Sequence, residues 1–275
     1  MLVIGLLAFV GLGLLPLLDS AIEADRSSSA TAEVTTTDTL NEVDRAELEA
    51  RERGYEQVVQ REPENQTALK GLIEARMELE DIEGTLEPLK KLAELNPDEP
   101  RYGVLVAQTQ YAIGDREAAA ATYRDVLSDR PGNIEALQGL VSLLLAEERP
   151  QAAIGVLENT LQTAPRLNEV EPGSIDTVSV QLLLGQVYAQ QSRNEEAIAI
   201  YDNIAESQPD DFRPLLGKAI VFRNPGKPAD ALPLLKRARD LAPAQFQDPI
   251  IAEIERLEAG APPAPALALR LFVSP

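Results

Sequence analysis

The amino-acid sequence predicts an all-α protein: a superhelical solenoid of antiparallel helix pairs that follows an N-terminal transmembrane helix. Three observations carry this prediction. Prolines recur at residues 63, 97, 131, 165, 209 and 243, so every gap is 34 residues except one of 44. Between these prolines, apolar residues follow helical spacing in two blocks separated by polar or glycine-containing turns. The stretch from Leu2 to Leu18 contains no charged side chain, which is typical of a membrane-spanning helix.

Residues 1–18 are predicted to be a transmembrane anchor or an uncleaved signal. Seventeen residues at about 1.5 Å each reach about 25 Å, slightly less than the ~30 Å hydrocarbon core of a bilayer. No Lys or Arg precedes the apolar run, which favours an anchor, whereas Pro16 late in the run is typical of a cleaved secretory signal. Residues 19–40 are rich in Ser and Thr and are predicted to be a flexible tether. The alternative is an exported soluble protein that has lost this segment.

The helix pairs of the solenoid follow from the prolines, because a proline cannot continue a helix and disfavours helical geometry in the residue before it. A pair of this kind cannot bury its outer face alone, so successive pairs must stack. The solenoid is predicted over 41–260, with repeats at 66–99, 100–133, 134–167, 178–211 and 212–245.

Alignment on the prolines places small side chains at one position of each second helix and large ones four residues later. Small side chains let two helix axes approach closely, and the large ones fill the space beside the crossing. The small residues are Thr85, Ala119, Ala153, Ala197 and Ala231, and the large ones are Leu89, Tyr123, Leu157, Tyr201 and Leu235. We call these two sets the small column and the large column.

Both ends of the solenoid have their own expected elements. Residues 41–62 are predicted to form a lone leading helix. Residues 248–258 are predicted to form a capping helix, with Asp248 as N-cap and Pro249 at the first helical position. The tail, residues 261–275, is rich in Pro and Ala and is predicted to be disordered.

Two irregularities interrupt the repeat. The gap of 44 residues is ten longer than one period, and the extra length lies within residues 166–177. This stretch is predicted to be a surface loop, with Asp176 or Thr177 capping the next helix, or else to reach over a binding surface. Pro88 and Pro233 occupy nearly equivalent places in their second helices, which either start late or are kinked. A late start is favoured for the unit that contains Gly84.

The columns resemble those of tetratricopeptide repeat (TPR) proteins. The unit 178–211 matches that pattern best, through Leu184, Gly185, Tyr188, Ala197, Tyr201 and Pro209. Lys218, where the pattern has Leu, and Arg76 and Gln110, where it has an aromatic residue, depart from it. The resemblance implies a TPR-type solenoid whose first helices line a concave groove that binds a protein or peptide.

The groove residues are carried over from the resemblance, position by position. They include few acids although the protein is strongly acidic, and their arginines suit an extended or helical peptide with acidic side chains. None of the expected first helices has the Lys-Asn pair of a chaperone-tail carboxylate clamp, so that ligand is disfavoured. The predicted groove residues are Lys70, Met77, Arg101, Gln108, Tyr111, Gln138, Leu145, Gln186, Gln190, Arg213, Arg223 and Asn224.

The composition excludes several kinds of catalytic and metal-binding site. The chain has no Cys and no His, which excludes disulfides, Cys or His zinc sites and Ser-His-Asp triads. We therefore expect no metal, no cofactor and no enzymatic activity. A hydrolase that uses acidic pairs such as Glu147-Glu148 or Glu195-Glu196 is a remote alternative, because these pairs fall at helix ends where acids cap helices. The formal charge of −20 disfavours nucleic acid as a partner.

The expected function is that of a membrane-tethered scaffold that holds a protein partner. The order of anchor, tether and repeats, together with the stretch QPDDFRPLLGKAIVF, is similar to membrane-associated TPR proteins of cyanobacteria and chloroplasts, the Slow Green type. This resemblance implies a role in assembly or maintenance of the photosynthetic apparatus, at the thylakoid or plasma membrane. The partner's identity, the side of the membrane and the oligomeric state are not specified by the sequence.

Overall fold

The computed structural model of this chain describes residues 42–223 and 228–260. These residues form helices and the turns between them, with no strand. The expected anchor, tether and tail, and the groove residue Asn224, lie outside the described residues. Among the helices that are described, none combines the length and the apolar character needed to cross a bilayer.

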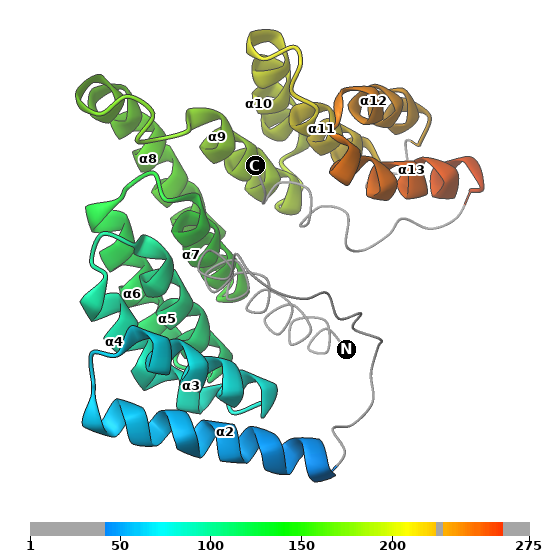
Figure 1. The fold of residues 1–275 in the computed structure, drawn as a ribbon. Coiled ribbons are helices and arrows are strands. Elements are labelled where there is room, and N and C mark those ends of the chain that lie inside the picture. The colour runs from blue at the N-terminus through cyan, green and yellow to red at the C-terminus, as the bar shows by residue number, and fades with distance from the viewer. Residues whose placement is uncertain (1–41, 224–227, 261–275) are drawn as a thin grey trace. The chain divides into compact units, whose positions relative to one another are not determined.

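The chain divides into two compact units, Met1–Arg130 and Pro131–Pro275, each of which is described by itself. The first contains α2 (Glu42–Arg61), α3 (Gln66–Glu78), the 3-10 turn η1 (Glu83–Thr85), α4 (Leu86–Leu95), α5 (Pro100–Ala112) and α6 (Arg116–Asp129). The second contains α7 (Ile134–Ala146), α8 (Pro150–Val170), α9 (Thr177–Gln190), α10 (Asn194–Ser207), α11 (Arg213–Arg223), α12 (Pro228–Leu241) and α13 (Ala244–Glu258). Within each unit, helices that follow each other along the chain pack side by side (Figure 1).

The periodic prolines set the helix ends at five of their six positions. Helices α2, α4, α6, α10 and α12 each end two residues before Pro63, Pro97, Pro131, Pro209 and Pro243, respectively. Pro165 was expected to end a helix as well, and this expectation is wrong, because α8 continues through it to Val170. A proline inside a helix lacks the N–H for one backbone hydrogen bond. Beyond Pro165 the helical hydrogen bonds continue to the end of α8, where Glu171 N–H donates to the Leu167 carbonyl (2.8 Å).

The insertion after Pro165 is therefore only partly a loop. Its first five residues belong to α8, and Asn168 near the end of that helix holds the turn that follows. The Asn168 side chain accepts hydrogen bonds from Ile175 N (2.8 Å) and Ser174 Oγ (3.1 Å) and donates one to the Ile175 carbonyl (2.9 Å). Ile175 is buried, and the turn lies so close to Gly132 that a Cβ there would meet the Ser174 carbonyl. Asp176 caps α9, as one of the two expected alternatives has it, by accepting from Val178 N and Ser179 N.

The leading helix predicted over 41–62 is present as α2 (Glu42–Arg61). Helix α2 packs against α3 and places Tyr55 over Gly71, much as a residue of the large column would. Where the repeats carry a small-column residue, α2 carries Arg51, which forms an ion pair with Glu78 of α3 (2.7 Å).

The C-terminal helix α13 begins at Ala244, so the prediction that Asp248 is its N-cap is wrong. An additional turn forms because Phe246 in it stacks on Phe212, with ring centroids 5.5 Å apart. Pro249 consequently lies inside the helix.

Pro88 and Pro233 take different places in their helices: Pro88 lies near the start of α4, and Pro233 lies inside α12. Helix α4 starts late, at Leu86, so Pro88 lies in its first turn, where a missing N–H costs nothing. Thr85 does not cap this helix; it is buried and its hydroxyl donates to the Ile82 carbonyl (2.7 Å). Helix α12 starts at Pro228 and contains Pro233 in its interior.

The small and large columns form the core of both units. Ala119, Ala153, Ala197 and Ala231 are fully buried, and the large-column residues are at most 4% exposed. Tyr201 shows how the columns work: its ring on α10 lies against Gly185 of α9 and Gly217 of α11. A Cβ on Gly217 would come within 2.6 Å of Tyr201 Cζ, so glycine is needed for the aromatic ring to fit between these helices.

We predict that Gly217→Ala destabilises the protein by about 1–3 kcal/mol, because the added methyl group overpacks the space filled by Tyr201. Gly155→Ala is the matched control on α8, where a Cβ meets nothing within 4 Å. This control should stabilise the protein by about 0.5–1 kcal/mol through helix propensity. Urea unfolding followed by circular dichroism measures both, and equal effects of the two substitutions would contradict the packing role of Gly217.

Candidate protein-binding face

The predicted groove residues lie on the first helices of the repeats and share an intermediate exposure. Within α3, α5, α7 and α9 they recur at spacings of three, four or seven residues, so they occupy one side of each helix, whereas Arg213 and Arg223 lie at the two ends of α11. Among the eleven that the structure describes, Gln190 is exposed and the others are half-buried. We call these eleven the first-helix face: Lys70, Met77, Arg101, Gln108 and Tyr111 in the first unit, and Gln138, Leu145, Gln186, Gln190, Arg213 and Arg223 in the second.

In the first unit, α5 presents polar groups that are buried without a hydrogen bond. Within the described residues, Arg101 Nε and Gln108 Oε1 have no hydrogen-bond partner, although Arg101 lies 3.4 Å from the Glu99 carboxylate. Tyr111 lies near Tyr123, and burial together with this neighbour raises the pKa of Tyr123. Both atoms are buried, so a partner reaches them only if the side chains move.

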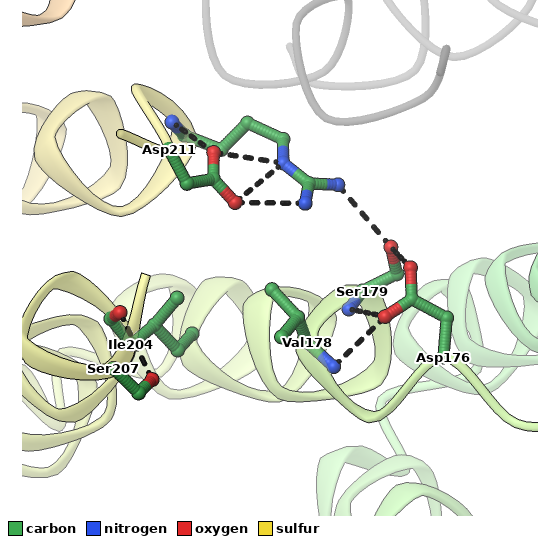
Figure 2. Close-up of polar contacts among 7 residues, drawn as sticks. Asp176, Val178, Ser179, Ile204, Ser207 and Asp211 are labelled. Carbon is green, nitrogen blue, oxygen red and sulfur yellow. Dashed lines mark hydrogen bonds and ion pairs between the residues drawn. The ribbon is translucent and has the colours of Figure 1, made fainter. Parts of the chain in front are cut away.

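Arg213 in the second unit is bound by neighbouring residues. Its guanidinium donates to the Asp211 carboxylate through Nε (3.0 Å) and Nη2 (2.8 Å), and to Ser179 Oγ through Nη1 (3.2 Å). The hydrogen bond with Asp211 raises the pKa of Arg213. Ser179 in turn donates to Asp176, the N-cap of α9, as Figure 2 shows. Arg213 thus joins the first turns of α9 and α11.

Arg223 is also engaged. Its Nη1 donates to Glu253 Oε1 on α13 at 2.9 Å, and the two side chains are 10% and 1% exposed, respectively. The second carboxylate oxygen of Glu253 lies 3.9 Å from Arg256 Nε. Sequence reasoning missed this partner, although Glu253 lies between Ile250 and Ile254 on the apolar stripe of α13, which signals a buried acid.

Two departures from the repeat pattern are explained by ion pairs with the adjacent second helix. Arg76, which replaces an aromatic residue, binds Glu52 (2.9 Å) and Glu56 (3.2 Å) of α2. Lys218, which replaces a leucine, binds Asp202 of α10. Both charged residues therefore hold a first helix against a neighbouring helix.

The acids considered for a hydrolase have ordinary helix-end contacts. Glu147 binds Arg149 (3.1 Å), and Glu196 binds Arg193 (2.9 Å). The hydrogen bond from Arg193 lowers the pKa of Glu196. Within the part of the chain that the structure describes, no cluster of acidic side chains is arranged to hold a metal ion.

Comparisons with known proteins identify the class of repeat. Two family models described as tetratricopeptide repeat match residues 111–171 and 179–246. The chain therefore carries tetratricopeptide repeats, which confirms the resemblance drawn from the columns. This fold is normally a non-catalytic scaffold for protein interaction.

The chain is also similar to one curated protein and to two solved structures. It is 24% identical over 185 residues to protein SLOW GREEN 1, chloroplastic, of Arabidopsis thaliana, which covers 67% of this chain and 57% of that protein. Yeast Tom70 matches with a TM-score of 0.55 and 12% identity, over 89% of this chain and 46% of that one. A tetratricopeptide repeat protein from Parabacteroides merdae matches with a TM-score of 0.51 and 17% identity, over 79% of this chain and 82% of that one. The two structures show that the fold is an all-helical TPR solenoid.

The Arg223–Glu253 pair should be far more important for stability than an exposed pair. Replacing Arg223 with Ala leaves the buried Glu253 carboxylate without its partner, and we expect a loss of about 3–5 kcal/mol. Arg256→Ala is the control, because Arg256 is 43% exposed and 3.9 Å from the same carboxylate, and it should cost at most about 1 kcal/mol. Chemical denaturation of both variants measures the difference, which would be absent if α13 were not packed against α11.

Proposed function

We propose that this protein is an interaction scaffold that holds a protein partner on its first-helix face. The observation that carries the proposal is the contrast between this face and the columns. The small and large columns are buried, whereas the first-helix face stays half-buried and carries polar side chains such as Arg101 and Gln108. The exposed donors and acceptors of such side chains can form hydrogen bonds with a partner that covers the face.

We further propose that the scaffold is tethered to a membrane and serves in assembly or maintenance of a photosynthetic complex. The uncharged residues 2–18, the Ser/Thr-rich residues 19–40 and the repeats occur in the order that a tethered scaffold requires. The similarity to a chloroplast protein supports the setting, and the chain spans only 57% of that protein's length. In this proposal residues 1–18 cross the thylakoid or plasma membrane and the repeats bind the client.

Crosslinking and affinity capture from native membranes test the scaffold role. We predict that Arg101→Glu on α5 reduces recovery of a specific partner by at least about fivefold, because a carboxylate replaces the cation at the face. Arg124→Glu is the matched control, since Arg124 is exposed on the second helix α6. Recovery that falls equally with both substitutions, or with neither, would contradict binding at the first-helix face.

Sequencing the N-terminus of the protein purified from its native source tests the tether. We expect the first residues to be retained and the protein to stay with the membrane through high salt and alkaline carbonate washes, because apolar burial is insensitive to both. A mature protein that starts beyond Ala21 and is released by washing would show instead that the protein is exported after signal cleavage.

A further inference from the structure

Two first helices of the second unit, α7 and α9, carry almost no charge although the protein is strongly acidic. Helix α9 has no charged residue, and α7 has one, Glu135. The adjacent second helix α10 carries four acids. Charge in this unit is therefore concentrated on the second helices, and two neighbouring first helices are almost neutral.

The polar side chains of this neutral surface are amides and a hydroxyl. Gln138 and Ser142 lie on α7, and Gln186 and Gln190 on α9, with Leu145 and Ala189 beside them. Within the described residues, none of these four polar side chains has a hydrogen-bond partner, and Ser142 and Gln190 are exposed. A glutamine amide both donates and accepts, so these groups can bond the N–H and C=O of a passing backbone.

The cations at the α11 end of the surface do not change this character. Asp211 and Ser179 bind Arg213, and the buried Glu253 binds Arg223. An acidic ligand would have to displace these carboxylates, and displacing the second would leave Glu253 buried without its main partner. The expectation that these arginines attract an acidic peptide therefore loses its physical basis in this unit.

We propose that α7, α9 and the adjacent part of α11 bind an uncharged segment of a partner polypeptide in extended conformation. This inference rests on the proposed scaffold function and specifies the ligand class of that site. A charged side chain brought against a neutral, half-buried surface loses hydration without a compensating charge, whereas an uncharged one does not. Neighbouring helix axes are about 8–10 Å apart and an extended residue spans about 3.3 Å, so roughly six residues cross these helices.

The test uses the full-length protein and an array of end-capped synthetic peptides of about twelve residues. Neutral, acidic and basic sets are matched in apolar content. We expect the neutral set to bind, with an affinity that changes by less than about twofold between about 0.05 and 0.5 M salt, because no ion pair is screened. Gln186→Glu should weaken binding about tenfold, since it removes the amide donor and adds a charge.

Gln162→Glu is the matched control, because it makes the same change at an exposed position on the second helix α8. Preference for acidic or basic peptides, failure of any set to bind, or equal affinities of the Gln186→Glu and wild-type proteins would each overturn the inference. The scaffold role is judged separately by partner capture: a partner recovered from membranes while the array selects charged peptides would refute only the ligand class.

Discussion

The close approach of helix axes at the small column is the constraint on which the rest of the structure depends. Where Ala119, Ala153, Ala197 or Ala231 meets the neighbouring helix, no solvent remains, and the large-column residue must fill the adjacent space. Tyr201 does so only because Gly185 and Gly217 leave room for its ring. Within each unit this geometry fixes successive helices against one another, and it thereby decides which side chains of the first helices remain available to a partner.

Charged residues enter this framework where the pattern of small and large apolar residues is broken. Arg76 and Lys218 replace apolar residues of the repeat, and each reaches a carboxylate on a neighbouring helix. Arg213 and Arg223 lie on the first-helix face, yet both are bound within the second unit. These four cations are therefore paired with carboxylates of the same chain. The surface left for a partner on α7 and α9 carries less charge than the net charge of −20 suggests.

The repeat spacing was enough to predict the fold because it depends on local rules. Proline ends helices, and small and large residues alternate at crossings, so five of the six helix ends and the buried columns follow directly. Pro165 and Asp248 are the exceptions, and both failed for a tertiary reason: the Asn168 hydrogen bonds fix the end of α8, and the Phe246–Phe212 contact extends α13 at its start. The first-helix face was placed by resemblance to TPR proteins, but its electrostatics depended on pairings such as Arg223 with Glu253, which join residues 30 positions apart.

Arg51 on α2 has a consequence for how this helix is held. In the repeats the same position holds a small side chain that lies within a close helix crossing, whereas Arg51 is fixed to Glu78 of α3 by an ion pair (2.7 Å). Both side chains of this pair are more than two-fifths exposed, so their attraction is screened by dissolved ions. The attachment of α2 to α3 therefore depends on ionic strength to a degree that an apolar crossing does not.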